Sequence, residues 1–165
     1  MGVHGKNKRI TVALWVAFAV SQANIARLLL PLGSDVGRLQ TTADPTVFRK
    51  IMGGWTPAQR EQYQRHLGPD TLHPFLYAAA LIASGRAVRQ PAQPRAVTLA
   101  LIAAPAASAV LDLVENAFHA RFTARPDDIT PRDAALSGAA TRTKWALALG
   151  SAVWIGVQAV RGSRS

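Results

Sequence analysis

Apolar residues are gathered into four long blocks, and this distribution constrains the fold more than any other feature of the sequence. The blocks cover residues 10–32, 71–85, 96–118 and 145–160, with most charged residues between them. A helix needs about 20 mostly apolar residues to cross the hydrocarbon core of a bilayer. The first and third blocks reach this length, and the other two reach it when polar residues at one end are included. The sequence therefore predicts an all-α integral membrane protein, a bundle of four transmembrane helices.

The predicted spans are at about residues 10–32, 70–86, 96–119 and 138–160, within one membrane domain of residues 1–165. One alternative is a soluble four-helix bundle with unusually apolar helices. The fourth block argues against it, because that block has no polar stripe that could face water. The other alternative is that the first block is a signal peptide, preceded by the basic stretch GKNKR. The apolar run continues past its SQA cleavage motif, which argues against this alternative.

Basic residues are concentrated on one side of such a bundle. The side with both termini and the second loop has eight basic residues and no acidic one: Lys6, Lys8, Arg9, Arg86, Arg89, Arg95, Arg161 and Arg164. Cytoplasmic loops of membrane proteins are enriched in Lys and Arg. We therefore expect the plasma (inner) membrane, with both termini in the cytoplasm. Contact with anionic membrane lipids accounts for the net charge of +10, and no nucleic-acid-binding motif accompanies it.

Ionisable residues occur near the same, outer end of all four predicted spans. The polar residues expected there are Asn24, Arg27, Asp70, His73, Tyr77, Asp112, Glu115, Asn116, His119, Arg142 and Lys144. Charged groups within a membrane face the bundle interior or a water-filled cavity, and they find partners there. We therefore predict an inward-facing polar layer near the outer leaflet, in which three basic and three acidic residues balance.

The first interpretation of this layer is a site for a lipidic or amphipathic small molecule. The ligand-binding candidates are Asn24, Arg27, Asp70, Tyr77, Asn116, Arg142 and Lys144. Conversion of an apolar substrate, by an isomerase, cyclase or hydrolase reaction, would need an acid and a base. The catalytic candidates are Asp112 and Glu115 as acid or base, with His119 or His73 as the proton partner.

Two other interpretations stay open. In the first, the buried charges are structural ion pairs of a non-catalytic membrane subunit or scaffold, which binds a membrane protein partner or forms a homo-oligomer. In the second, Asp70, His73, Glu115 and His119 bind a metal ion, since each carboxylate–His pair lies about one helical turn apart. Three basic residues in the same layer would repel a metal ion. The chain has no Cys, which excludes thiolate metal sites and a Cys nucleophile.

The extracytoplasmic loop, residues 33–69, is too long to be a simple connection. The stretches DPTVFRKIMGGW and TPAQREQYQRHL each predict a short amphipathic helix. In the second stretch, Thr56 and Gln59 form a capping-box pattern around Pro57. The apolar residues of the first stretch would anchor it on the membrane surface or make it a lid over the polar layer, and we favour the anchor.

Overall fold

The computed structural model describes residues 3–90 and 93–162, which form helices and connecting turns. The elements are α1 (Val3–Leu29), η1 (Leu30–Leu32), α2 (Asp35–Thr41), α3 (Pro45–Gly54), α4 (Pro57–Ala87), α5 (Arg95–Ala124), η2 (Pro126–Asp128) and α6 (Pro131–Gly162). Here η1 and η2 are single 3-10 turns. No strand occurs among these residues, so the predicted all-α class is confirmed.

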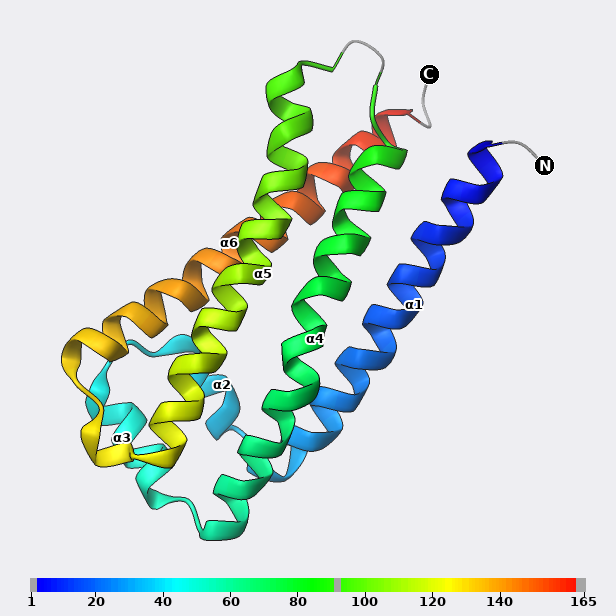
Figure 1. The fold of residues 1–165 in the computed structure, drawn as a ribbon. Coiled ribbons are helices and arrows are strands. Elements are labelled where there is room, and N and C mark those ends of the chain that lie inside the picture. The colour runs from blue at the N-terminus through cyan, green and yellow to red at the C-terminus, as the bar shows by residue number, and fades with distance from the viewer. Residues whose placement is uncertain (1–2, 91–92, 163–165) are drawn as a thin grey trace.

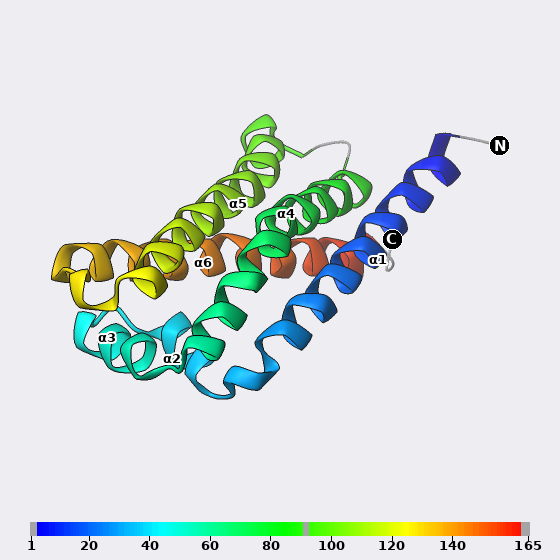
Figure 2. The ribbon, with the colours of Figure 1, turned by 60° about the horizontal axis from the view of Figure 1, so that its bottom comes forward.

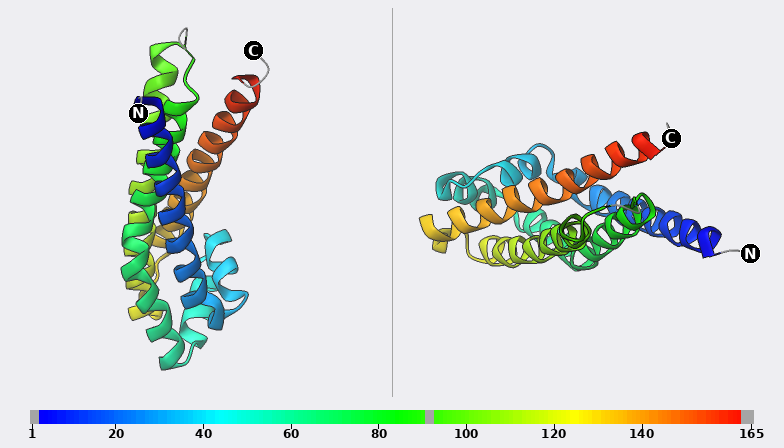
Figure 3. Two further views of the ribbon diagram at one scale, coloured as in Figure 1. Left: turned by 90° about the vertical axis from the view of Figure 1, so that its right-hand side faces the viewer. Right: turned by 90° about the horizontal axis from the view of Figure 1, so that it is seen from above.

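The four long helices run alternately up and down, as Figure 1 shows. Helix α1 packs along α4, α4 along α5, and α5 along α6. The start of α1, the end of α4, the start of α5 and the end of α6 lie at one end of the molecule, and α2 and α3 lie together at the other (Figure 2). Helices α1 and α6 share at most slight contact, and they diverge in both views of Figure 3. The bundle is therefore open along one side.

Two segments are long and apolar enough to cross a membrane, Asn7–Leu32 and Arg95–Ala124. They correspond to the first and third predicted spans, and few of their residues are buried within the protein. Only 6% of the residues in the most apolar window of the first segment are buried, and 22% in that of the second. Neither segment therefore resembles the core helix of a compact soluble domain, whose apolar residues are covered by protein.

Helix α4 is one continuous helix, so the prediction of a separate short helix at TPAQREQYQRHL is wrong. This stretch forms the first turns of α4, and the predicted capping box of Thr56 and Gln59 is present there. The helix continues through Pro69 and Pro74, although a proline lacks the N–H that an α-helix needs. At Pro74 the unpaired carbonyl of Asp70 accepts a hydrogen bond from Asn116 Nδ2 of α5, at 3.4 Å.

Helices α2 and α3 and the turn η2 form a cap at one end of the bundle. The prediction that α3 anchors on the membrane surface is wrong, because its apolar side chains are buried in the protein. Phe48 and Met52 have no exposed surface, and they belong to one core cluster with Phe122 and Ile129. Gly138 lets α6 approach the turn between α2 and α3, since a Cβ atom there would lie 2.6 Å from the Cβ atom of Ala43.

Candidate functional site

A cleft of about 560 Å³ occupies the open side of the bundle, between α1 and α6. Helix α4 forms its floor, α2 closes it at the cap end, and α5 contributes Ser108 and Asp112. Its apolar part is lined by Trp15, Phe18, Leu81, Ala148, Leu149 and Ala152. Its polar part is lined by Gln40, His66, Asp70, His73, Tyr77, Asp112 and Lys144. Ile25, Leu29 and Val36 also line it, so the lining combines apolar and polar side chains.

A buried ion-pair cluster lies at the polar part of the cleft. Lys144 Nζ is 2.5 Å from Asp112 Oδ1 and 2.7 Å from Glu115 Oε2. Gln40 Nε2 donates a hydrogen bond to Glu115 Oε1 at 2.9 Å, so α2 takes part in the cluster. Lys144 is 7% exposed, Asp112 is 6% exposed and Glu115 is fully buried. One ammonium group thus contacts two carboxylates from the facing helix, which leaves the cluster with more acidic than basic groups, and the three groups depend on one another.

Helix α4 presents a stripe of polar and aromatic residues to the interior. Tyr77 donates a hydrogen bond to Ser108 Oγ at 2.9 Å, since the hydroxyl hydrogen of Ser108 goes to the Lys144 carbonyl at 2.8 Å. His73 Nδ1 lies 3.1 Å from Ser21 Oγ of α1, and the His73 ring stacks on Phe18. These contacts tie α4 to α5 and α1, and Ser108 continues the network from α5 to α6.

The first turns of α4 place Tyr63 and His66 beneath the cap. Burial and the nearby Glu115 carboxylate raise the pKa of Tyr63 well above its usual range, so its hydroxyl keeps its proton. That hydroxyl lies 2.6 Å from His119 Nδ1. Burial lowers the pKa of His66, which keeps its ring neutral. The Nδ1–H of His66 donates to the carbonyl of Tyr63, so His66 Nε2 carries the lone pair.

Arg27 and Arg142 do not join the polar cluster, so the predicted balance of three basic and three acidic residues is wrong. Both side chains are exposed and neither lines the cleft. Arg27 instead donates to Asn24 Oδ1 at 3.2 Å, and Asn24 also lies outside the cleft. The reason is helical geometry, because Arg142 precedes Lys144 by two residues, about 200° around the helix. Only one of the two can face inward.

The remaining predicted residues divide between the cleft and the packed interior. Asp70, His73, Tyr77, Asp112 and Lys144 line the cleft. Glu115 and His119 are buried behind it, and Asn116 supports the carbonyl of Asp70. The sequence analysis missed Gln40, because α2 is only seven residues long and has no strong helical pattern. It also missed the aromatic wall of Trp15 and Phe18, which has no signal beyond the apolar composition of the span.

The four residues proposed as metal ligands are not brought together. Within residues 3–90 and 93–162, no group of three or more His, Asp or Glu side chains is placed to hold a metal ion. Glu115 contacts Lys144 and Gln40, and His119 contacts Tyr63. His119 Nε2 has no hydrogen-bond partner among the described residues, but its ring packs against Phe48 and Phe122 rather than against a carboxylate.

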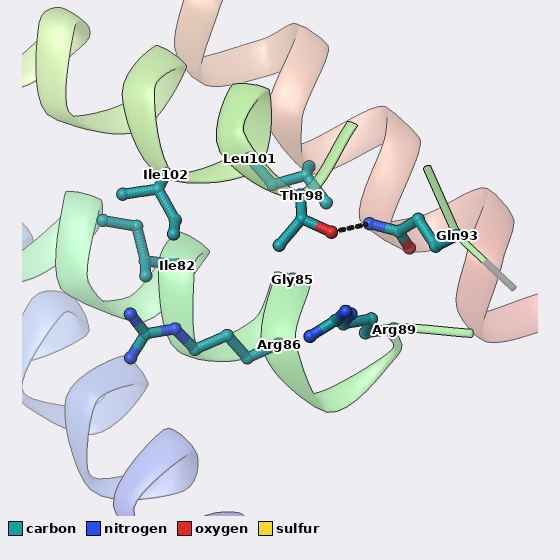
Figure 4. Close-up of a pocket in the computed structure, with 8 residues that line it drawn as sticks. All are labelled: Ile82, Gly85, Arg86, Arg89, Gln93, Thr98, Leu101 and Ile102. Carbon is teal, nitrogen blue, oxygen red and sulfur yellow. Dashed lines mark hydrogen bonds between the residues drawn. The ribbon is translucent and has the colours of Figure 1, made fainter. Parts of the chain in front are cut away.

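A second, smaller cavity of about 430 Å³ lies at the other end of the bundle, between the end of α4 and the start of α5. Arg86 and Arg89 lie on one side of it, opposite Leu101 and Ile102, as Figure 4 shows. The residues that line it include no carboxylate. The two ends of the bundle therefore differ in charge: this cavity is basic, and the cleft contains the acidic residues.

The sequence matches no known family model, and it shows no significant similarity to a curated protein or to a solved structure.

Proposed function

We propose that this chain is a small integral membrane protein that binds a lipidic or amphipathic small molecule in the cleft between α1 and α6. The observation that carries the proposal is the cleft itself. Its volume of about 560 Å³ is in the range of small-molecule sites, which commonly enclose about 300–1,000 Å³. Its apolar part suits a hydrocarbon chain, and its buried ionisable groups suit a polar head group.

Exposed apolar side chains on all four long helices support the membrane part of the proposal. They are Ile10, Val12, Trp15, Val16, Val20, Leu72, Phe75, Leu99, Val110, Val114, Leu136, Trp145, Leu149, Val153, Val157 and Val160. The accessible surface is 9702 Å², whereas a compact monomer of 17.6 kDa would have about 7,900 Å². An apolar surface of this extent is unfavourable in water and favourable in lipid.

The proposed arrangement has four spans, formed by α1 and by parts of α4, α5 and α6. The protein crosses the plasma (inner) membrane, the end with Arg86 and Arg89 faces the cytoplasm, and the cap faces outward. In this arrangement α1 and α6 both border lipid, and the gap between them lets a lipidic molecule enter sideways. The polar part of the cleft then lies toward the outer leaflet, beneath the cap.

Binding has more support than conversion. Of the four catalytic candidates, Asp112 and His73 line the cleft, whereas Glu115 and His119 have no surface there. Asp112 is already held by Lys144 at 2.5 Å. A general acid or base must reach the substrate proton within hydrogen-bond distance. Acid–base chemistry in the cleft would therefore depend on residues that the pairing leaves accessible, chiefly Asp70 and His73.

Native mass spectrometry of the protein released from a mild detergent tests the proposal. We expect a stoichiometric adduct with the mass of an amphipathic molecule, which organic extraction then identifies. Ala148 lines the cleft and Ala146 on the same helix is exposed outside it. Ala148→Phe should lower retention of the adduct, and Ala146→Phe should leave it unchanged. A bare protein, or equal retention in both variants, would count against a ligand in this cleft.

A non-catalytic membrane subunit is the second candidate function. The observation that favours it is the complete pairing of Lys144 with Asp112 and Glu115, which a purely structural cluster would also show. In this case the exposed faces of α1 and α6 bind another membrane protein or a second copy of the chain. The same spectra decide between the candidates, because a subunit would carry protein mass instead of a small adduct.

A further inference from the structure

The polar part of the cleft has an excess of negative charge, and this indicates which head group it accepts. Among the described residues that line the cleft, Lys144 is the only Lys or Arg. Its ammonium group is already bound by Asp112 and Glu115, at 2.5 and 2.7 Å. Asp70 also lines the cleft, and no Lys, Arg or His of the described chain lies within ion-pair distance of its carboxylate. An anionic head group would find no free cation here.

His66 provides a second, independent observation. Its side chain lines the cleft and is 3% exposed. Because the carbonyl of Tyr63 can only accept a hydrogen bond, Nδ1 of His66 carries the hydrogen and Nε2 carries the lone pair. Nε2 has no hydrogen-bond partner among the described residues. Nε2 is not one of the fully buried polar atoms that lack a partner, so it is accessible from the cleft and can accept a hydrogen bond from a donor there.

His66 and Asp70 are four residues apart on α4, so their side chains are neighbours on one helix face, with Cβ atoms about 6 Å apart. One group with several N–H donors can therefore reach both acceptors at once. The aromatic rings of Trp15 and Phe18 of α1 line the cleft, and Ala148 and Leu149 line it from α6. From Tyr63 to Leu81 the cleft extends along α4 for about 27 Å of helix, enough for a head group and one hydrocarbon chain.

We propose that the cleft binds a single-chain amphiphile with a primary ammonium head, which donates to the Asp70 carboxylate and to His66 Nε2. The chain of the amphiphile lies between the aromatic residues of α1 and the small residues of α6. This inference rests on the proposed function and specifies its ligand class. It assigns the head group to Asp70 and His66, whereas the ligand-binding candidates from the sequence also included the basic residues Arg27, Arg142 and Lys144.

Matched dodecyl amphiphiles test the head-group preference on the full-length protein in a non-ionic detergent. The probes are dodecylammonium, dodecyltrimethylammonium and dodecyl phosphate, and affinity is measured by titration with native mass spectrometry. We expect the affinity for dodecylammonium to be at least about tenfold higher than the affinity for either other probe. The net charge of the protein is +10, so non-specific electrostatics would favour the phosphate. A preference for dodecylammonium would therefore indicate binding in the cleft and not non-specific attraction to the protein.

Two substitutions on α4 localise the effect. Asp70→Asn should weaken dodecylammonium binding about tenfold and leave dodecyl phosphate unaffected or slightly tighter. Glu61→Gln is the control, because it removes one carboxylate from the same helix at a site that is 64% exposed and paired with Arg65. It should change neither affinity. If Asp70→Asn lowers the folded yield, His66→Leu is the second variant, and it should reduce the preference for dodecylammonium over dodecyltrimethylammonium.

The outcomes separate this inference from the proposed function. Equal binding of the three probes, with Ala148→Phe still weakening all of them, would overturn the ammonium specificity and leave a lipid cleft. Tighter binding of dodecyl phosphate, or equal effects of Asp70→Asn and Glu61→Gln, would also overturn it. If no probe binds and no adduct is retained from cells, the proposed function fails as well.

Discussion

At the scale of single residues, the polar interior depends on Lys144. Its ammonium group is the only partner within ion-pair distance for either Asp112 or Glu115 in the part of the chain that the structure describes. Gln40, which lies in the cap, donates a hydrogen bond to the second carboxylate oxygen of Glu115. Removing one member of a buried ion pair leaves an unpaired charge, which costs more than the pair itself contributes.

Lys144→Met should therefore lower the free energy of unfolding by about 3–5 kcal/mol. The measurement is reversible unfolding in detergent micelles, followed by circular dichroism. Arg142→Met is the matched control, since Arg142 lies on the same helix and is exposed; it should change stability by less than about 0.5 kcal/mol. Adding Glu115→Gln to Lys144→Met should restore part of the loss. Equal effects of the two single substitutions would contradict the role assigned to Lys144.

His66 makes stability depend on pH. Burial lowers its pKa from the ordinary value of 6.5, so the folded state binds fewer protons than the unfolded state below that pH. The contribution of neutral His66 is fully present above about pH 6.5, and it is lost as the pH falls through the lower, folded-state pKa. We expect His66→Gln to flatten the stability profile below about pH 6.5, in the range that extends down to the lowered, folded-state pKa. Parallel profiles for the two proteins would show that His66 does not contribute.

At the scale of elements, a side chain of α5 supports helix α4 at Pro74, where one backbone hydrogen bond of the helix is missing. Pro74 cannot donate to the carbonyl of Asp70, and Asn116 Nδ2 donates to it instead. This contact lies directly beside the cleft, since Asp70 lines it. An unsatisfied carbonyl in an apolar environment costs free energy, so Asn116 stabilises both α4 and its packing on α5.

A double-mutant cycle measures this support. Asn116→Leu should cost about 1–3 kcal/mol, because it leaves the Asp70 carbonyl without a donor. In the background of Pro74→Ala, the backbone N–H at position 74 supplies that donor, so the same substitution should cost about 1 kcal/mol less. The two free-energy differences come from unfolding of the four proteins in one detergent. Additive effects of the two substitutions would show that the proline and the amide are not coupled.

At the scale of the whole molecule, the two ends of the bundle differ from each other in composition, and the surface between them is apolar. The basic cavity with Arg86 and Arg89 lies at one end, and the cap, which contains a core cluster of buried apolar residues, lies at the other. Between them the long helices expose apolar side chains. In the proposed membrane arrangement, the cap is surrounded by water and the bundle by lipid.

Single cysteines test this orientation, because the natural chain contains none. Arg125 and Arg89 are both exposed arginines. Arg89 follows the end of α4 and Arg125 follows the end of α5, and these two helix ends lie at opposite ends of the bundle. A membrane-impermeant maleimide should label Arg125→Cys in intact cells and should label Arg89→Cys only after permeabilisation. Labelling of both variants in intact cells, or the reverse pattern, would contradict the proposed topology.

Sequence patterns correctly predicted the features that depend only on residues close together in the chain. The apolar blocks predicted the long helices α1 and α5, because the backbone hydrogen bonds of a helix join residues that are close in the sequence. The capping box of Thr56 and Gln59 identified the start of α4 for the same reason. The spacing of polar residues in the third predicted span also identified its interior face correctly, since Asp112, Glu115 and His119 are all buried. These features need no knowledge of what packs against the helix.

Only the tertiary structure decided which of these groups form a site. Gln40 and Glu115 are 75 residues apart in the chain, and no local pattern relates them. The choice of Lys144 over Arg142 depends on how α6 is rotated against α5, and the continuity of α4 through Pro74 depends on Asn116 of a neighbouring helix. The cleft exists because α1 and α6 each pack on other helices and at most slightly on each other. Helix formation is local, whereas the packing that creates a cavity involves the whole chain.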